Sequence, residues 1–342
     1  MVRALFSIGT NSTRLLVLDG AARVAAESRG TRIGTGIGQT GSIDAAARER
    51  TLAAIDEYVA IARTHGAEAV DAIATSALRR AHDGAAFAAD VAARVGVAPR
   101  VISGDEEATY SFLGATASRG DDAHGGITEG GAGRPLAVLD VGGGSTEVAI
   151  DVPAHARARG VVARTLSLEV GAVRLSERHP ALLGARALDA AEREALKAQA
   201  AADASTVLAP MAAERGFDEL IAVGGTVFTA GLMLNAGNSD GTAMTGAQRA
   251  AMIDDLLARD LTSRKAIPHI RPQRADILPA GLIVVDEACR LLAVDTITVS
   301  EADLLLGYLA SPAFRAGALP PTSPEAVVQS QAPKARGGMM VE

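Results

Sequence analysis

Cysteine, tryptophan and long apolar runs are scarce or absent in this sequence of 342 residues. Its one cysteine, Cys289, excludes an internal disulfide and any cysteine-rich zinc site. The surrounding sequence, IVVDEACRLL, is typical of a buried small side chain rather than a nucleophile. No segment approaches the roughly 20 uninterrupted apolar residues of a membrane span, and the N-terminus lacks the apolar core and cleavage site of a signal peptide. We therefore expect a cytoplasmic protein without a membrane partner.

Positive charge is also in short supply. The chain has 33 lysines and arginines against 40 aspartates and glutamates, a net charge of −7. This balance argues against a protein that coats nucleic acid, and we expect no such partner. A polyanionic substrate stays open, because a few arginines and a metal ion can hold one inside a cleft while the outer surface remains acidic.

One loop is present twice. Residues 4–19 read ALFSIGTNSTRLLVLD, and residues 137–151 read AVLDVGGGSTEVAID. Each copy is an apolar run, a turn of small residues and a second apolar run, which predicts a β-hairpin whose turn exposes consecutive N–H groups to an anion. At an offset of 133 residues the copies align as follows: Gly9 with Gly142, Ser12 with Ser145, Thr13 with Thr146, and Arg14 with Glu147.

The order of the remaining patterns predicts the domain organisation. Each half of the chain begins with such a hairpin and continues with helix and strand patterns, which is typical of an α/β fold. Residues 118–135 are polar and rich in glycine, so we expect a boundary loop there. We therefore predict domains over 1–117 and 136–312, with a cleft between their hairpins, and a disordered tail over 313–342.

The second turn, within LDVGGGSTE, carries the strongest chemical signal. Asp140 ends a strand and is placed to hold Mg²⁺, directly or through water, while Gly142 to Ser145 are placed to hold phosphate oxygens. The alternative is an ordinary glycine-rich hairpin with a surface acid. Three consecutive glycines cost ordering entropy that an ordinary hairpin would avoid, which favours the phosphate site.

Three further segments are candidates for the same site. A strand ends and a helix begins at Gly225 and Thr226, a helix N-terminus that suits phosphate. Residues 105–107 place three acids at a helix start, where acids also simply favour the helix dipole. Segment 75–80, TSALRR, is expected to end a strand with two arginines that point in different directions, so that at most one of them reaches a phosphate.

Seven motifs in this order resemble the exopolyphosphatase/guanosine pentaphosphate phosphatase (Ppx/GppA) family. They are SIGTNSTRLL, ATSALRRA, SGDEEATYSFLGA, LDVGGGSTEVAI, VGAVRLSERH, AVGGTVFTAG and RADILPAGLIVVDEA. The resemblance covers about residues 1–312 and implies the fold of that family, two actin-like (ribonuclease H-like) domains of the sugar kinase, chaperone and actin superfamily. The chain resembles the short form, without the C-terminal HD-type helical domain of longer members.

The resemblance also implies roles for individual residues. The catalytic glutamate falls on Glu107, and the magnesium-binding acids fall on Asp140 and Glu147. The implied cofactor is Mg²⁺, and the implied substrate is inorganic polyphosphate or guanosine pentaphosphate (pppGpp). The family's phosphate-binding arginine falls on Arg79, and the glycine and hydroxyl residues of both turns match its phosphate-binding loops. With the helix start named above, the predicted phosphate-binding residues are Gly9, Thr10, Asn11, Ser12, Arg14, Arg79, Gly142, Gly143, Gly144, Ser145, Thr146, Gly225 and Thr226.

Three positions depart from the family pattern. The first loop of the family begins with aspartate, but this chain has Ser7, which the internal repeat places opposite Asp140. A hydroxyl cannot replace the charge of a carboxylate on Mg²⁺, although it can hold a coordinated water. The family asparagine after TSALRxA is Asp83 here, and the common LREG pattern is residues 304–307, LLLG.

Together these observations predict a Mg²⁺-dependent exopolyphosphatase that releases terminal phosphate by attack of water. The alternative within the family is a pppGpp 5′-phosphatase. Because of Ser7, a polyphosphate- or alarmone-binding protein with little turnover is an alternative from another class. A kinase of the same superfamily is disfavoured, because the glutamate of SGDEEA suits activation of water. The sequence leaves a homodimer open.

Overall fold

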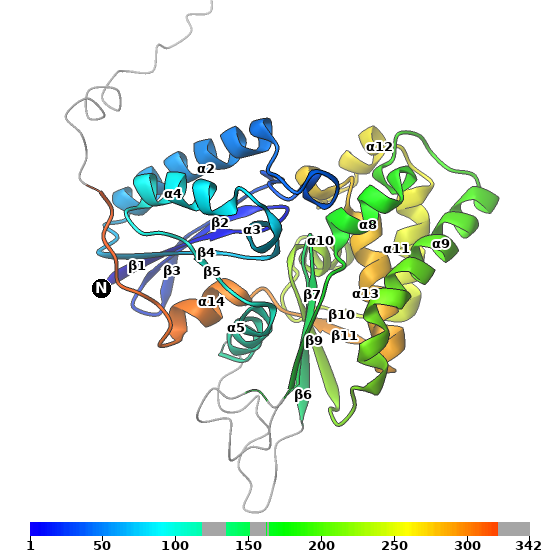
Figure 1. The fold of residues 1–342 in the computed structure, drawn as a ribbon. Helices are drawn as coiled ribbons and strands as arrows, with labels where there is room; N and C mark the ends of the chain where they lie inside the picture. The colour runs from blue at the N-terminus through cyan, green and yellow to red at the C-terminus, as the bar shows by residue number, and fades with distance from the viewer. Residues whose placement is uncertain (118–134, 151–161, 163, 321–342) are drawn as a thin grey trace, which may run out of the picture.

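The computed structural model describes residues 1–117, 135–150, 162 and 164–320. These residues form two lobes, each built on its own β-sheet (Figure 1). The expected boundary loop over 118–135 lies outside the described residues except for Pro135. Among the described helices, none combines the length and the apolar character needed to cross a membrane.

The first sheet has five strands in the order β3-β2-β1-β4-β5. Strands β1 and β2 form the first predicted hairpin, and β1 also pairs in parallel with β4. Helices α2 (Ala45–Thr64) and α4 (Gly84–Val95) pack side by side next to this sheet. The strands are β1 (Val2–Ile8), β2 (Thr13–Asp19), β3 (Ala22–Arg29), β4 (Ala69–Ala74) and β5 (Arg100–Val101).

The second sheet repeats this plan with six strands in the order β10-β11-β9-β6-β7-β8. Strands β6 and β7 form the second predicted hairpin, and β6 pairs in parallel with β9, as β1 does with β4. The sequence repeat is therefore a repeat of topology. The strands are β6 (Leu136–Val141), β7 (Thr146–Ile150), β8 (Arg164–Leu168), β9 (Glu219–Val223), β10 (Ala243–Met244) and β11 (Ile297–Val299).

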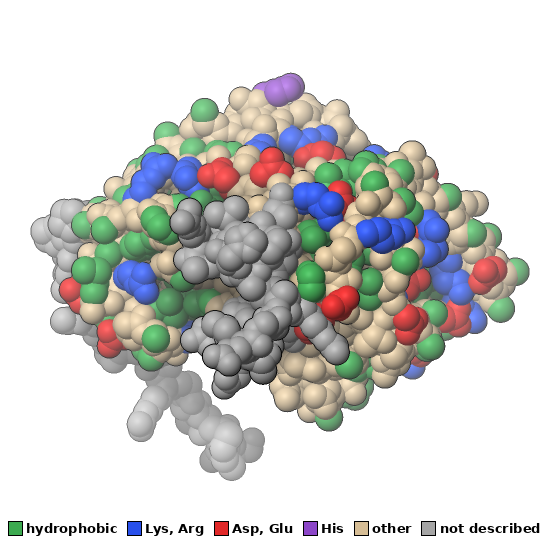
Figure 2. Space-filling view, turned by 90° about the horizontal axis from the view of Figure 1, so that it is seen from below, with side chains coloured by type: hydrophobic (Ala, Val, Ile, Leu, Met, Phe, Trp, Pro, Cys, Tyr) green, Lys and Arg blue, Asp and Glu red, His purple; other side chains and the backbone are tan. Residues whose placement is uncertain are grey.

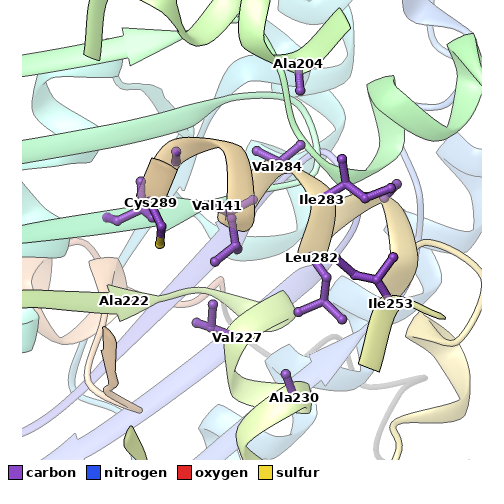
Figure 3. Packing of buried hydrophobic residues seen from close by; sticks show 14 of the residues in the cluster. Val141, Ala204, Ala222, Val227, Ala230, Ile253, Leu282, Ile283, Val284 and Cys289 are labelled. Carbon is purple, nitrogen blue, oxygen red and sulfur yellow. The ribbon is translucent and has the colours of Figure 1, made fainter. Parts of the chain in front are cut away.

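Helix α13 (Leu278–Leu292) is the centre of the larger hydrophobic core. It contacts α9 (Ala190–Leu208), α10 (Gly225–Leu234) and α11 (Gly246–Leu257), and the shorter α8 (Ala172–Arg178) and α12 (Leu261–Lys265) complete this layer. Figure 3 shows α13 between Ala204 of α9 and Val227 of α10. Cys289 is fully buried in this core, and burial raises the pKa of its thiol to about 12. It is a packing residue, as the sequence predicted.

Two helices lie between the sheets and cross at glycines. Helix α5 (Gly104–Ala117) packs on the second sheet through Ala108 and Phe112, while α14 (Leu304–Ala310) packs on the first sheet. A Cβ atom at Gly114 of α5 would collide with the backbone of α14, and one at Gly307 of α14 would collide with α5. The glycines therefore allow the close helix crossing seen in Figure 1.

Local details differ from the sequence predictions in two places. Residues Ser76–Arg80 form a short helix, α3, rather than the end of a strand. Residues 313–320 are not disordered: Gly317 pairs with Val70 beside the first sheet. The remainder of the expected tail lies outside the described residues. These contacts join positions far apart in the sequence, which local patterns do not report.

The surface mixes charges of both signs. On the face in Figure 2, arginine and lysine side chains lie beside aspartates and glutamates. Most arginines of the described residues are paired in this way, for example Arg29 with Glu57 at 2.6 Å and Arg23 with Glu301 at 3.0 Å. Unpaired cationic groups therefore stand out, and two of them occur inside a cavity described below.

Candidate active site

The two predicted loops are closed by the same backbone hydrogen bond. The N–H of Gly9 donates to the carbonyl of Ser12 at 2.9 Å, and that of Gly142 donates to the carbonyl of Ser145 at 3.0 Å. A Cβ atom at either glycine would lie close to that same carbonyl, at 3.2 Å and 3.1 Å respectively. The sequence repeat is thus confirmed at the level of individual hydrogen bonds.

The turns of the two hairpins lie against each other. A Cβ atom at Gly143 would be 3.1 Å from the Cβ atom and the backbone nitrogen of Asn11, and one at Gly144 would be 2.5 Å from the hydroxyl of Thr10. Both glycines are needed because a side chain at either position would force the loops apart. The small residues predicted to bind phosphate therefore converge from the two lobes.

The two hairpins differ in the residues that face each other across their strands. Asp140 pairs with Glu147 in the second hairpin, and Ser7 pairs with Arg14 in the first. All four lie at the turn ends of their strands. The second hairpin therefore presents two acids where the first presents a hydroxyl and a guanidinium.

Glu107 is the one acid of its segment that faces the loops. It is 8% exposed, and its Oε2 atom accepts a hydrogen bond from Nη1 of Arg79 at 3.0 Å. Asp105 is bound instead by Thr165, and Glu106 caps its own helix and pairs with Arg100. The assignment of chemistry to Glu107 alone within this segment thus agrees with the geometry.

The adjacent arginines separate as the sequence predicted. Arg79 points inward, where it contacts Glu107 and donates to the carbonyl of Ile102 at 2.8 Å. Arg80 points outward, and its Nε lies 3.8 Å from a carboxylate oxygen of Glu169. They sit in helix α3, whose turn directs consecutive side chains about 100° apart.

Three buried carboxyl groups lie close enough to affect one another. Burial raises the pKa of Glu107 to about 7 and that of Asp140 to about 6, and in Glu107 the pull of Arg79 opposes the shift. Burial also raises the pKa of Glu147 well above its usual range, and the charges of Glu107 and Asp140 add to this rise. Buried carboxyl groups with raised pKa values are typical of active sites and cation sites.

Each of the second hairpin's acids is also held by hydroxyl groups. Ser111 of α5 donates to Oδ2 of Asp140 at 2.6 Å. Ser167 of β8 donates to Oε1 of Glu147 at 2.8 Å, and Ser145 of the turn also hydrogen-bonds it. The orientation of both carboxylates is therefore fixed before any ligand binds.

These acids fit a divalent cation that keeps waters in its coordination shell. Among the described residues, no group of three or more aspartate, glutamate, histidine or cysteine side chains is arranged as a complete metal site. Mg²⁺ does not need one, because it usually binds one or two carboxylates together with waters and phosphate oxygens. Asp140 and Glu147 could supply the carboxylates, and a cation would relieve their repulsion.

Not every predicted phosphate ligand points into the site. The hydroxyl of Thr146 donates to the carbonyl of Val170 at 2.6 Å, and the side chain of Thr226 packs against Gly281 of α13. The strand and the helix turn these hydroxyls into the core, so neither side chain faces a phosphate, and a contact through the backbone N–H groups at the start of α10 stays a prediction. Arg14 does face the site, but it is already bound to an acid, Asp303.

Sequence reasoning missed Arg274, which reaches the first loop. Its Nη2 atom donates to the hydroxyl of Ser12 at 3.1 Å, and its guanidinium lies over Gly225, where a Cβ atom would collide with it. Its Nε is buried and has no hydrogen-bond partner among the described residues. Arg274 begins the motif RADILPAG, which marked the resemblance but whose arginine carried no sign of a contact 262 residues away.

A model of the Ppx/GppA phosphatase family matches residues 17–313. The chain belongs to the Ppx/GppA phosphatase family. The fold is the α/β fold with two sheets that the sequence predicted. The chain is an enzyme, a phosphoanhydride hydrolase.

Curated relatives carry two different names. Exopolyphosphatase 2 from Mycobacterium tuberculosis (strain ATCC 25618 / H37Rv) is 32% identical over 336 residues, which cover 90% of this chain and 97% of that protein. Guanosine-5'-triphosphate,3'-diphosphate pyrophosphatase from Vibrio atlanticus (strain LGP32) is 28% identical over 313 residues, which cover 89% of this chain and 58% of that protein. The two names correspond to the two substrates that the sequence left open.

Solved structures agree with the fold. An exopolyphosphatase-like protein matches with a TM-score of 0.78 and 26% identity, covering 92% of this chain and 99% of that chain. An exopolyphosphatase from Cytophaga hutchinsonii matches with a TM-score of 0.75 at 22% identity, covering 90% of this chain and 96% of that chain. The latter likeness supports the fold alone.

Proposed function

We propose that this protein is a Mg²⁺-dependent exopolyphosphatase that releases the terminal phosphate of inorganic polyphosphate by attack of water. The observation that carries the proposal is Glu107, a buried carboxylate with a pKa of about 7 that lies beside the two phosphate loops. A general base works best when its pKa is near the working pH. Glu107 meets this condition because burial opposes its ionisation while Arg79 supports it.

Glu107 would orient the attacking water and accept its proton. The ion pair with Arg79 fixes the carboxylate, and the second hydrogen bond of Arg79, to Ile102, holds the arginine in place. The remaining N–H groups of this guanidinium are free to meet a phosphate oxygen. One residue thus positions the base and stabilises charge on the transferring group.

The two turns would hold the terminal phosphate between them. The N–H groups of Gly9 and Gly142 close the turns, so the other backbone N–H groups of the turns would meet the phosphate, and Thr10 and Ser12 would add hydroxyl groups. Donors that are fixed before the reaction stabilise developing negative charge without a cost of reorganisation. The equal backbone geometry of the two loops supports a phosphate held symmetrically.

Asp140 and Glu147 would hold Mg²⁺ together with waters and substrate oxygens. The ion supplies charge neutralisation on the phosphate oxygens during transfer. Ser111 and Ser167 keep the two carboxylates oriented toward it. Ser7, in place of a loop aspartate, would hold at most a coordinated water.

Hydrolysis of pppGpp is the second candidate, since the chemistry at the terminal phosphate is the same. Polyphosphate is preferred because the relative named exopolyphosphatase 2 matches over nearly its whole length, whereas the chain spans 58% of the relative named for the guanosine substrate. A low-turnover binding protein is the third candidate, favoured only by Ser7.

One assay separates the three candidates. Phosphate release is measured side by side from long-chain polyphosphate, short-chain polyphosphate and pppGpp, over a Mg²⁺ series that includes a chelator control. We expect the highest kcat/KM with polyphosphate and no release without Mg²⁺. Preference for pppGpp would establish the second candidate, and tight polyphosphate binding without release would establish the third.

A further inference from the structure

A cavity of about 550 Å³ adjoins the loops on the side away from the catalytic glutamate. Its lining includes Arg14 of the first hairpin, Gly225 at the start of α10, and Asp303, the residue that precedes α14. Neither Glu107 nor Glu147 lines it. In an in-line reaction the water and the leaving group stand on opposite sides of the transferring phosphate. The cavity is therefore the space in which the leaving phosphates would lie.

Four arginines line this cavity; Arg23 forms an exposed pair with Glu301, and the other three are Arg14, Arg271 and Arg274. Arg271 stacks over the ring of Phe228 at 4.3 Å, and Arg274 binds Ser12; neither has an acidic partner within the part of the chain that the structure describes. Burial, together with the charges of Arg14 and Arg271, lowers the pKa of Arg274 to about 10. Like charges that crowd in this way indicate a site for an anion.

Arg14 is the exception, because it is bound to Asp303. Its Nη1 lies 2.6 Å from Oδ2 of Asp303. The other acids that line the cavity, Glu27, Asp240 and Glu301, are exposed, whereas Asp303 is 8% exposed. The pair thus places one buried negative charge of the protein itself among three positive charges.

The two partners differ in their freedom to move. Asp303 is fixed, because its Oδ1 caps α14 by accepting from the N–H of Leu305 at 3.1 Å and its backbone lies against Gly114 at the helix crossing. The side chain of Arg14 is 33% exposed, so a phosphate can approach it from the cavity. The side chain of Arg14, and not that of Asp303, can therefore leave the pair and bind a phosphate.

We propose that Asp303 neutralises the guanidinium of Arg14 in the substrate-free protein and that a phosphate of the substrate replaces Asp303 as its partner. Asp303 thereby sets the affinity of the cavity for condensed phosphate and is a positioning residue, not a catalytic one. This inference rests on the proposed function, because it takes the substrate to be a chain of phosphates. Such a chain can contact Arg14, Arg271 and Arg274 together, which a single carboxylate cannot do.

The test measures binding without turnover. Inorganic tripolyphosphate is titrated calorimetrically into the full chain with a chelator present, for wild type and Asp303→Asn. The asparagine keeps an oxygen that can cap α14 but removes the charge. We expect the Kd to fall about tenfold at low salt and the difference to shrink as salt is added.

Two further variants show whether Arg14 mediates the effect. In an Arg14→Gln background, Asp303→Asn should change the Kd less than about twofold, because no guanidinium is left to release. Glu301→Gln removes the acid of the exposed pair with Arg23 on the same cavity, so it controls for general charge and should cause a smaller change than Asp303→Asn. Asp303→Ser, which also caps a helix, replaces the asparagine if that variant is unstable.

Each outcome decides the inference. An unchanged or higher Kd for tripolyphosphate in Asp303→Asn would overturn it. A tenfold fall in Kd that persists in the Arg14→Gln background would also overturn it. These binding constants do not depend on catalysis. Absence of phosphate release from every condensed phosphate would therefore contradict the proposed function alone, while an active enzyme with an unchanged Kd in Asp303→Asn would contradict this inference alone.

Discussion

The two hairpins of this protein share one backbone and carry opposite charges. In the second hairpin Asp140 faces Glu147 across the strands, and in the first Ser7 faces Arg14 at the same positions. The acids of the second hairpin lie near Glu107, whereas Arg14 lies toward the cavity with Arg274. A duplicated phosphate loop thus has one copy suited to a metal ion and one suited to the anionic substrate.

The two hairpins also differ in how their buried charges are balanced. The second hairpin buries two acids next to Glu107, so their pKa values rise. The first hairpin buries no acid, and its arginine takes its counter-charge from Asp303, which belongs to the far end of the chain. Buried acids therefore cluster around the second hairpin, whereas the guanidinium of the first hairpin is already matched by an acid.

The largest expected effect comes from substitution of Glu107, which lies near the acids of the second hairpin. Glu107→Gln should reduce phosphate release by about 10²–10⁴-fold, the usual contribution of a general base, while polyphosphate binding and folding persist. In wild type, the rate should fall as pH drops below about 7, since Glu107 becomes protonated there. The variant's remaining rate should lack this dependence. Retention of more than about a tenth of the activity would assign the base to another group.

Asp140→Ala and Ser7→Ala compare the hairpins directly at equivalent positions. We expect the first to lower turnover about 100-fold or more and to raise the Mg²⁺ requirement steeply. The second should change turnover less than about threefold, because a hydroxyl holds at most a coordinated water. A Mg²⁺ titration of both variants provides the measurement. An unchanged titration in Asp140→Ala would make this aspartate a structural turn residue only.

The inward and outward arginines of α3 form a matched pair. Arg79→Ala should weaken substrate binding and turnover about tenfold or more, since this residue contacts Glu107 and can reach a phosphate. Arg80→Ala should cost less than about threefold, because its partner is the exposed Glu169. KM and kcat are measured at two ionic strengths. Equal losses would indicate a diffuse basic surface rather than one directed contact.

Much of this site could be predicted from the sequence because its loops are local. The glycine turns, the acids at the start of α5 and the pairing of Asp140 with Glu147 each depend on residues close together in the chain. Arg274 and Asp303 could not be found in this way, since each meets its partner only through the packing of the two lobes. The pairing of Gly317 with Val70 of the first sheet could not be predicted from the sequence for the same reason.

Stability should respond to pH with the opposite sign to activity. Because burial raises the pKa of Glu147, the folded protein holds a proton there at pH values where the unfolded chain has released it. The contribution of this group to stability is therefore present at low pH and is lost as pH rises through the folded-state pKa. Without Mg²⁺, Glu147→Gln should raise Tm by a few degrees at pH 8 and hardly at all near pH 4. The exposed Glu194→Gln, measured in parallel, should leave Tm unchanged at both pH values.

Ser7→Asp makes the two hairpins alike, and its effect is expected to be the smallest. The new carboxylate would lie in a buried position with Arg14 as its cross-strand neighbour. If Ser7 merely weakens an active enzyme, the change should tighten the Mg²⁺ dependence and raise turnover a few-fold. If the wild-type protein only binds polyphosphate, the change should create activity where there was none.

A third outcome of Ser7→Asp is a loss of activity, which would show that the site has adapted to a neutral residue at this position. An added acid would then repel the phosphate and raise the pKa of Asp140 still further. Wild type and variant, assayed across one Mg²⁺ series and at two pH values, separate these cases. We expect the first outcome, because Arg14 is the cross-strand neighbour of residue 7 and offers the new carboxylate a counter-charge. A fall in turnover at every Mg²⁺ concentration would contradict this expectation.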